Sequence, residues 1–218
     1  MKKKFVLFVL FILPLVAYLF FATGANHFIV LPTVTPNIPE LKTSWKTQDA
    51  MPARLSGKIT ILSFVGDDLW NHRGNFFTLH QKIYKPYQSF KDFQFVWIAP
   101  IGSEVQVSKL LQALNALSDN HRYRAVFASQ SDIDQYYESL HLVGSLDEHH
   151  GSPLVFIVDK KCNLRGRKGK SKKGEIEYKE GYNTQSAAEL HNDMTDDVKI
   201  ILAEYRSALK KNNAQRKV

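Results

Sequence analysis

The N-terminal segment of this chain constrains its fold more than any other feature. Three lysines, Lys2 to Lys4, precede a run from Phe5 to Ala22 that contains no charged residue. A run of about 18 or more apolar residues can span a bilayer as a helix, the form in which one segment satisfies its own backbone hydrogen bonds. Because the lysines precede the run and none follows it directly, the sequence predicts a cytoplasmic N-terminus and a domain on the other side of the membrane.

Cleavage as a signal peptide is the alternative for this segment. The apolar core of a signal peptide is roughly 7–15 residues long and ends at small residues. Here the run is longer, and the bulky Tyr18, Phe20 and Phe21 stand where small residues are expected. We therefore expect an uncleaved anchor over residues 1–24, a membrane helix that tolerates Pro14 as a kink.

The remaining chain fits one domain and a linker. Residues 25–56 contain four prolines and lack sustained periodicity, which indicates a linker. Residues 57–218 are long enough to bury a core without disulfides or metal. The chain has a single cysteine, Cys162, so no disulfide can form within one molecule.

Short apolar runs alternate with segments of helical spacing across residues 57–218. The expected strands are Ile59–Val65, Phe93–Ala99, Ala125–Ala128 and Leu154–Val158, with a return strand from Leu164 after a turn. The expected helices are Phe76–Tyr84, stopped by Pro86, then Ser103–Leu117, Ser131–Leu140 and Ser186–Leu209. The order β-α-β-α-β-α-β-β-α predicts a sheet with parallel members and helices on both faces.

This order, with Pro153 opening the first hairpin strand, resembles a thioredoxin fold. More narrowly, the chain resembles the Sco/SenC family of membrane-anchored copper chaperones. The segments that carry the resemblance are ITILSFVG, FQFVWIAP, RAVFAS, PLVFIVDKKCNLRGR and SAAELHNDM, within roughly residues 57 to 210. The resemblance implies a thioredoxin-like three-layer α/β/α sandwich with an N-terminal transmembrane helix, and a cis peptide bond before Pro153.

The chain departs from this family at its reactive motif. Family members carry CxxxC just after the first strand, where two thiolates and a distant histidine bind copper or exchange disulfides. Here the loop reads DDLWNHRGN, and Trp70 and Gly74 stand about where the cysteines would be. Neither side chain can ligate metal or attack a disulfide. We therefore expect a binding or assembly module rather than an enzyme, with no cofactor.

A metal site of different composition is the alternative, with copper as the candidate cofactor. His149 and His150 lie close to the place of the family's distant histidine. With His72 and Asp68, and with Asp67 beside them, they would supply nitrogen and oxygen ligands for copper or another divalent metal. The competing interpretation is that these residues lie on exposed loops and are simply hydrated.

A basic stretch is the last candidate for an interaction. The formal net charge is +8, and Lys160 to Lys173 alone carry eight lysines and arginines. One interpretation is binding to anionic lipid or to an acidic protein partner, and the other is a solvated, charged loop. We do not expect nucleic acid, which an exported domain rarely meets. Within the stretch, Lys160, Lys161 and Arg165 could lower the pKa of Cys162 and make it reactive, unless it is an idle turn residue.

These expectations describe a single-pass protein of a bacterial inner membrane with its domain in the periplasm. By resemblance alone, its surroundings would be the maturation of a respiratory oxidase. The alternative function is that of a metallochaperone with a histidine and carboxylate site.

Overall fold

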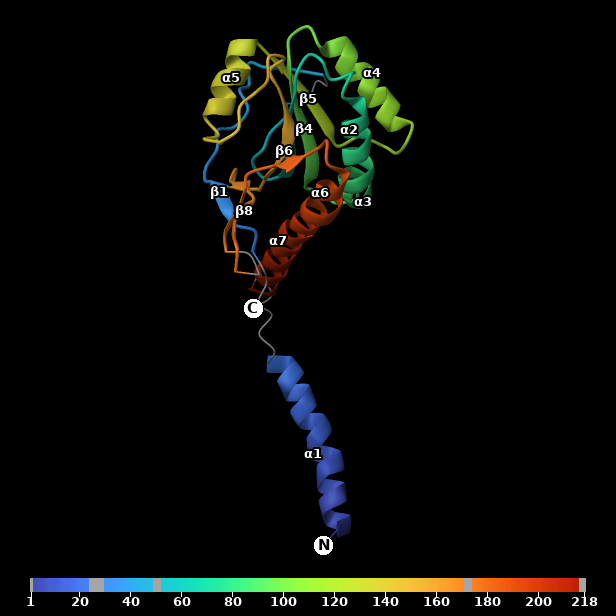
Figure 1. Ribbon diagram of the computed structural model, residues 1–218. Helices are drawn as coiled ribbons and strands as arrows, with labels where there is room; N and C mark the ends of the chain where they lie inside the picture. Colours follow the sequence, from blue (N-terminus) through green and yellow to red (C-terminus); the bar gives the residue numbers. More distant parts are fainter. Residues whose placement is uncertain (1, 24–29, 49–51, 171–173, 216–218) are drawn as a thin grey trace.

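A mixed β-sheet forms the centre of the domain (Figure 1). The computed structural model describes residues 2–23, 30–48, 52–170 and 174–215. The strands of this sheet are β1 (Thr33–Thr35), β2 (Lys46–Thr47), β3 (Ile59–Val65), β4 (Phe93–Pro100), β5 (Tyr123–Ala128), β6 (Gly151–Val158), β7 (Leu164–Arg165) and β10 (Tyr182–Asn183). Their order is β1-β7-β6-β3-β4-β5-β2, with β10 paired to β6. A separate hairpin contains β8 (Arg167–Lys170) and β9 (Ile176–Lys179).

Helices connect these strands. The first connection is one continuous helical stretch, made of α2 (Arg73–Leu79), the π-helical turn η1 (His80–Tyr84) and α3 (Lys85–Tyr87). The next two are α4 (Glu104–Asn115) and α5 (Gln130–Glu138). The last helical stretch consists of α6 (Ala187–Glu189), the π-helical turn η2 (Leu190–Met194) and α7 (Thr195–Gln215).

The central strands confirm the strand predictions. Every residue of β3 and β4 is buried, as expected for parallel strands covered on both faces. β3, β4 and β5 run parallel, whereas β6 pairs antiparallel with β3. Hence the carboxyl ends of β3, β4 and β5 lie at one end of the sheet, together with the amino end of β6.

The two faces of the sheet are covered differently (Figure 1). One core lies between the sheet and α2, α4 and α7, and includes Phe76, Leu110 and Val198. The other lies between the sheet and α5, and includes Ile133 and Tyr136 together with residues from 38–45. Helices on both faces were predicted correctly, but on the second face a stretch of N-terminal chain packs beside a single helix.

The predicted linker over residues 25–56 is wrong for most of its length. β1 pairs with β7, β2 pairs with β5, and Leu41 and Trp45 are buried. The Glu40 carboxylate accepts hydrogen bonds from the backbone N–H of Leu55 and Ser56, at 2.7 and 2.9 Å. Strands of two or three residues between prolines carry no periodic signal, so tertiary pairing alone defines them. Residues 25–29 and 49–51 of this prediction lie outside the described residues.

The first helical stretch also continues further than predicted. Pro86 lies inside α3, and the helix ends one residue later, at Tyr87. The N–H of Lys85 donates to the carbonyl of His80 across the π-helical turn. This wider turn directly precedes Pro86, whose ring would clash with the carbonyl of an ordinary helical turn.

The predicted anchor is helical. Helix α1 (Lys2–Thr23) contains Pro14, and its large apolar side chains between Phe5 and Leu19 are exposed. Among the residues described, no helix is long and apolar enough to cross a membrane. The side chains of Phe20 to Ala22, which complete the predicted span, lie outside that set. The membrane placement of residues 1–24 therefore stays a prediction.

Candidate functional site at the carboxyl end of β3

Two loops meet where β3 ends and β6 begins. Gly66 has φ +65°, and a Cβ atom there would lie 2.9 Å from the carbonyl oxygen of His149. Only glycine therefore permits this approach of the two backbones. Directly beyond it, the N–H of Asp67 donates to the same carbonyl at 3.2 Å. The loop after β3 is thus fixed against the loop before β6.

A histidine–carboxylate pair lies on this junction. His149 Nδ1 is 2.8 Å from Asp67 Oδ1, and the two side chains are 45% and 44% exposed. The hydrogen bond that the His149 ring donates to Asp67 raises the pKa of His149 above its ordinary value. Partial desolvation opposes this rise, and the charges of Asp67, Asp68 and Glu148 add to it. Since both groups are hydrated, the pair contributes little to folding.

The neighbouring His150 faces elsewhere. Its backbone has φ +54°, and its Nδ1 lies 2.7 Å from Asp134 Oδ1 on α5. The turn is held by Asp147, whose Oδ1 accepts from the N–H groups of His149 and Gly151 at 2.9 and 2.8 Å. Sequence reasoning missed Asp134 and Asp147. An aspartate two residues before His149 is a turn signal that could have indicated the second of them.

His72 and Asp68 form a third, separate group. His72 Nδ1 lies 3.8 Å from Asp68 Oδ2 and 3.3 Å from the backbone oxygen of Asp68. The other carboxylate oxygen of Asp68 accepts from the Asn71 side chain at 2.5 Å. These contacts close the turn that leads into α2.

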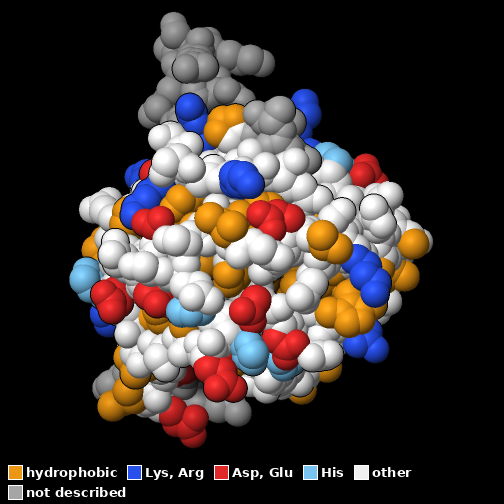
Figure 2. Space-filling model, turned by 90° about the horizontal axis from the view of Figure 1, so that it is seen from above, with side chains coloured by type: hydrophobic (Ala, Val, Ile, Leu, Met, Phe, Trp, Pro, Cys, Tyr) orange, Lys and Arg blue, Asp and Glu red, His pale blue; other side chains and the backbone are white. Residues whose placement is uncertain are grey.

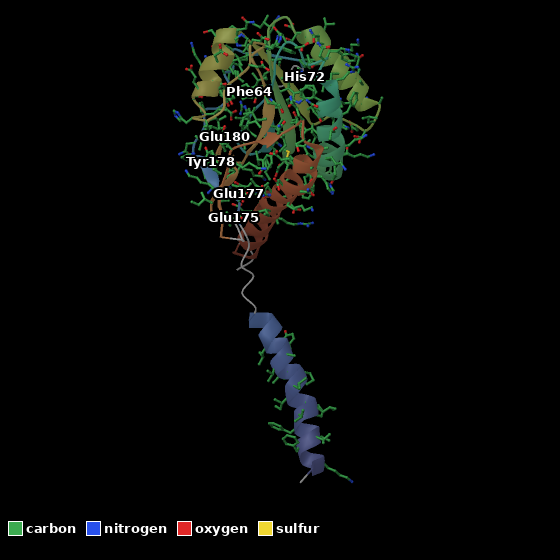
Figure 3. The ribbon with its side chains drawn as sticks, viewed as in Figure 1. Phe64, His72, Glu175, Glu177, Tyr178 and Glu180 are labelled. Atoms are coloured by element: carbon green, nitrogen blue, oxygen red, sulfur yellow. The ribbon has the colours of Figure 1, made fainter. Side chains whose placement is uncertain are left out.

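The structure therefore distributes the predicted metal ligands His149, His150, His72 and Asp68 over three pairs. All of them belong to the same end of the domain, where histidines and carboxylates gather in Figure 2 and where Figure 3 labels His72. Within the described residues, no group of three or more histidine, cysteine, aspartate or glutamate side chains is placed to hold a metal ion. Each histidine instead has its own carboxylate partner.

Trp70 occupies the position after β3 where the resemblance implies a thiol. The ammonium nitrogen of Lys109 lies 3.8 Å from the centroid of its indole ring, and the guanidinium of Arg73 lies 5.3 Å from it. Cation–π contacts of this kind hold the ring against α4 and α2. At Gly74, by contrast, a Cβ atom would meet nothing within 4 Å. At the two positions where the family carries cysteines, this chain thus has an indole ring in contact with two cations and a helical glycine with open space around it.

Comparison with known proteins gives the fold. No family model matches the sequence, and no curated protein matches it. Among solved structures, a proposed protein disulfide isomerase from Bacteroides thetaiotaomicron aligns with TM-score 0.52 and 12% identity, over 83% of this chain and 98% of the other. BsSco, a member of the Sco family of cytochrome c oxidase assembly proteins, aligns with TM-score 0.52 and 13% identity, over 78% and 95%. The chain has a thioredoxin-like fold. The predicted likeness to thioredoxin-fold proteins, BsSco among them, is confirmed as a likeness of fold.

A small cavity lies between the two loops of the thioredoxin-like domain. Its volume is about 60 Å³, and His72, Phe76, Asp147 and Pro153 are among the residues that line it. Pockets for small ligands usually measure roughly 300–1,000 Å³, so this one has room for little more than water. A hollow of about 350 Å³, partly lined by Gln112, lies between α4 and β5.

The expected cis peptide bond before Pro153 is wrong, because the described residues contain no cis peptide bond. Pro153 lies inside β6, where its carbonyl accepts from the N–H and the hydroxyl of Thr184, both at 2.9 Å. The next two residues of β6 pair with β10. A trans bond keeps this segment extended, as the pairing requires.

Cys162 lies at the opposite end of the thioredoxin-like domain. It occupies the turn between β6 and β7, as predicted, and its N–H donates to Asp159. The register places Thr60 beside Val158 at that end and Val65 beside Gly151 at the other, about 16 Å apart at the usual strand rise. Burial, with Glu40 and Asp159 nearby, raises the pKa of the Cys162 thiol. This contradicts one of the two interpretations of Cys162, activation by its basic neighbours, and the other, a turn residue without a task, stays a prediction.

Three basic residues of the stretch Lys160–Lys173 form ion pairs within the domain: Lys160, Arg165 and Arg167. Lys160 Nζ lies 2.5 Å from Asp92, and Arg165 is buried against Asp159. Arg167 pairs with acidic residues of α7, η2 and β9, with Asp197 the nearest at 2.7 Å. Lys172 and Lys173 lie outside the described residues. The stretch is not one continuous free patch, and its binding to lipid or protein stays a prediction.

Proposed function

We propose that this chain is a membrane-anchored, exported thioredoxin-like domain that acts as a binding or assembly module and performs no dithiol chemistry. The observation that carries the proposal is the loop after β3. There the side chain of Trp70 is held between Lys109 and Arg73, and Gly74 has no side chain. The one thiol of the chain, Cys162, is at the other end of the sheet and has a raised pKa, so it supplies neither a pair nor a ready nucleophile.

Membrane anchoring is part of this proposal and rests on the sequence. The uncharged run from Phe5 to Ala22 after three lysines supports a single span with its N-terminus in the cytoplasm. The domain then lies in the periplasm of a bacterial inner membrane. The likeness to BsSco, named as a member of a family of cytochrome c oxidase assembly proteins, supports a task in respiratory oxidase assembly.

A disulfide-exchange assay tests the absence of dithiol chemistry. We expect the purified full-length chain in mild detergent to reduce insulin with dithiothreitol no faster than dithiothreitol alone. The matched control is Cys162→Ser, which removes the only sulfhydryl without touching the loop after β3. Turnover in the natural chain that disappears in Cys162→Ser would overturn the proposal, because it would show redox work through this one thiol.

A metallochaperone is the second candidate, favoured by the position of Asp67 and His149 beside the loop that holds Asp68 and His72. The test is calorimetric titration of the full-length chain with Cu(I), Cu(II) and Zn(II). Tight binding of one ion per chain, lost in a double variant with His149→Ala and His150→Ala, would replace the module by the metallochaperone. The control is His121→Ala, an exposed histidine that also pairs with an aspartate, at 2.8 Å.

A further inference from the structure

The β8–β9 hairpin has two faces of different chemistry. Its register pairs Arg167 with Lys179, Lys168 with Tyr178, and Lys170 with Ile176. Because side chains alternate along a strand, Arg167, Glu177 and Lys179 share one face, and Lys168, Ile176 and Tyr178 share the other. We call the second the outer face of the hairpin.

Ion pairs join the inner face of the hairpin to the last helical stretch, and one further pair joins the two strands of the hairpin. Arg167 contacts Glu177, Asp193 and Asp197 at 3.0, 3.3 and 2.7 Å. Lys179 contacts Glu189 and Asp193 at 3.1 and 2.6 Å. This network fixes the hairpin on α6, η2 and α7, so the outer face has a defined direction.

The outer face is apolar, aromatic and basic, yet it is open to solvent. Ile176 is 87% exposed and Tyr178 is 49% exposed, with the tyrosine hydroxyl donating to Glu180 at 3.2 Å. Lys168 is exposed and forms no ion pair with any residue that the structure describes. An aliphatic side chain, a tyrosine ring and a free lysine are the combination that suits the headgroup region of an anionic bilayer.

The hairpin also lies beside the segment that leads to α1. The N–H of Gly166 donates to the carbonyl of Pro32 at 3.0 Å, and the guanidinium of Arg165 donates to the carbonyl of Leu31 at 2.8 Å. Thr23, the last residue of α1, is seven residues before Val30. Fully extended, seven residues reach about 25 Å, so the end of α1 can lie no further than this from Val30. Figure 3 shows Glu175, Glu177 and Tyr178 toward the end of the domain nearer α1, away from His72.

We propose that the outer face of the β8–β9 hairpin lies on the anionic headgroup surface of the bilayer that holds residues 1–24. This rests on the proposed membrane anchor. Ile176 and the Tyr178 ring enter the headgroup layer, and Lys168 lies among the lipid phosphates. The loops around Asp67 and His149, at the other end of the sheet, then face away from the membrane, where a partner can reach them.

Site-specific lipid quenching tests this placement in the full chain. In a Cys162→Ser background, single cysteines are introduced by Ile176→Cys, Val105→Cys or Leu10→Cys and labelled with an environment-sensitive fluorophore. Val105, on α4, is 79% exposed and serves as the matched control. The proteins are reconstituted into phosphatidylcholine vesicles with or without phosphatidylglycerol, containing lipids with a spin label near the headgroup or deep in the acyl chain.

We expect headgroup quenching at position 176 to exceed that at 105 at least threefold in anionic vesicles, and to fall in neutral ones or at high salt. In the 176-labelled protein, Lys168→Glu should weaken quenching at least twofold. The control Lys82→Glu, an exposed lysine outside the hairpin, should leave it unchanged.

Each of three outcomes would reject either the membrane anchor or the placement of the hairpin on the bilayer. If the label at position 10 is not quenched by spin labels deep in the acyl chains, the anchor is rejected. Quenching at 10 with equal signals at 176 and 105 rejects the hairpin inference and leaves the anchor standing. Shielding of 176 in detergent that grows with protein concentration also rejects it, because a second copy of the chain would then cover the outer face.

Discussion

The two ends of the thioredoxin-like domain both carry opposite charges in contact, but they use them differently. Near β7, Arg165 and Asp159 are 2.8 Å apart with side chains only 5% and 2% exposed. At the carboxyl end of β3, His149 and Asp67 are also 2.8 Å apart, but with side chains 45% and 44% exposed. The two distances are the same, so the burial of each pair determines how much it affects the stability of the fold.

The difference separates a rigid end from an adaptable one. Burial would raise the pKa of Asp159, but hydrogen bonds from the Asn163 N–H and from Arg165 hold it below its ordinary value. Arg165 also binds the Leu31 carbonyl and Glu204, so one side chain joins β7, the N-terminal segment and α7. At the other end, each pair has at least one member on a loop, and Asp67 with His149 is exposed enough to exchange its partner for water or for another molecule. Figure 2 shows this end as an open surface of histidines and carboxylates.

The largest expected change comes from restoring a dithiol at the adaptable end. The double variant with Trp70→Cys and Gly74→Cys should form an internal disulfide on oxidation and catalyse insulin reduction, against no catalysis in the natural chain. Space at Gly74 is open, and removal of the indole leaves Lys109 beside position 70, where a cation favours a thiolate. The readouts are thiol counting and insulin turbidity. The serine double variant at the same positions is the control, and failure of the two thiols to oxidise would contradict the placement of this loop.

The next largest effect is expected at the rigid end. Arg165→Ala should lower the free energy of unfolding by about 3–5 kcal/mol, because it leaves the Asp159 carboxylate buried and unpaired. Thermal unfolding of the full-length chain in detergent, followed by circular dichroism, measures this. The matched control is Lys199→Ala, which breaks an exposed pair with Asp196 and should leave the midpoint unchanged. Equal small effects of both variants would remove the contrast between the two ends.

The sequence predicted the interior of this fold better than its edges. Continuous apolar runs predicted β3 and β4 correctly. The expected helix start at Ser186 is confirmed as well, since the Ser186 hydroxyl accepts from the Glu189 N–H. β1 and β2 are too short to show a periodic pattern in the sequence. They are strands only because they pair with β7 and β5, which lie far along the chain.

The candidate site was predictable only in part. Histidines and carboxylates at one end of the sheet followed from the strand order. Their pairing did not: His149 and His150 are adjacent in sequence, but a left-handed backbone at His150 sends the second ring to α5. Nothing in the sequence indicated that Glu204 and Asp197 of α7 pair with Arg165 and Arg167, because these partners lie 30 or more residues further along the chain.

A buried histidine gives a third, intermediate effect. His80 is fully buried, with its ring nitrogens 3.1 Å from the Tyr123 hydroxyl and 2.7 Å from the Ser118 hydroxyl. Burial, with a smaller contribution from Lys85, lowers its pKa to about 4. His80 therefore takes up a proton more readily in the unfolded chain than in the folded one. The free energy of unfolding is at its full value above about pH 6.5 and decreases as the pH falls toward 4.

Unfolding measurements between pH 7 and 4 follow this loss of folding free energy, which we expect to be about 3 kcal/mol. His80→Gln, which cannot take up a proton, should start from a lower stability at pH 7 and show a flatter decline. A decline as steep as in the natural chain would assign the acid sensitivity to other groups.

The smallest effect on stability is expected for the exposed pair of His149 and Asp67, which joins the loops after β3 and before β6. The raised pKa of His149 means that its charge stabilises the fold below the unfolded value and that this contribution disappears as the pH rises through the folded value. Proton NMR of the histidine rings should give a pKa for His149 above its ordinary 6.5, and Asp67→Asn should return it toward that value. Because both side chains are hydrated, the same variant should leave the unfolding midpoint unchanged. A drop comparable to that of Arg165→Ala would mean that the loops are held as firmly as the buried end, and the adaptable surface would have to be sought elsewhere.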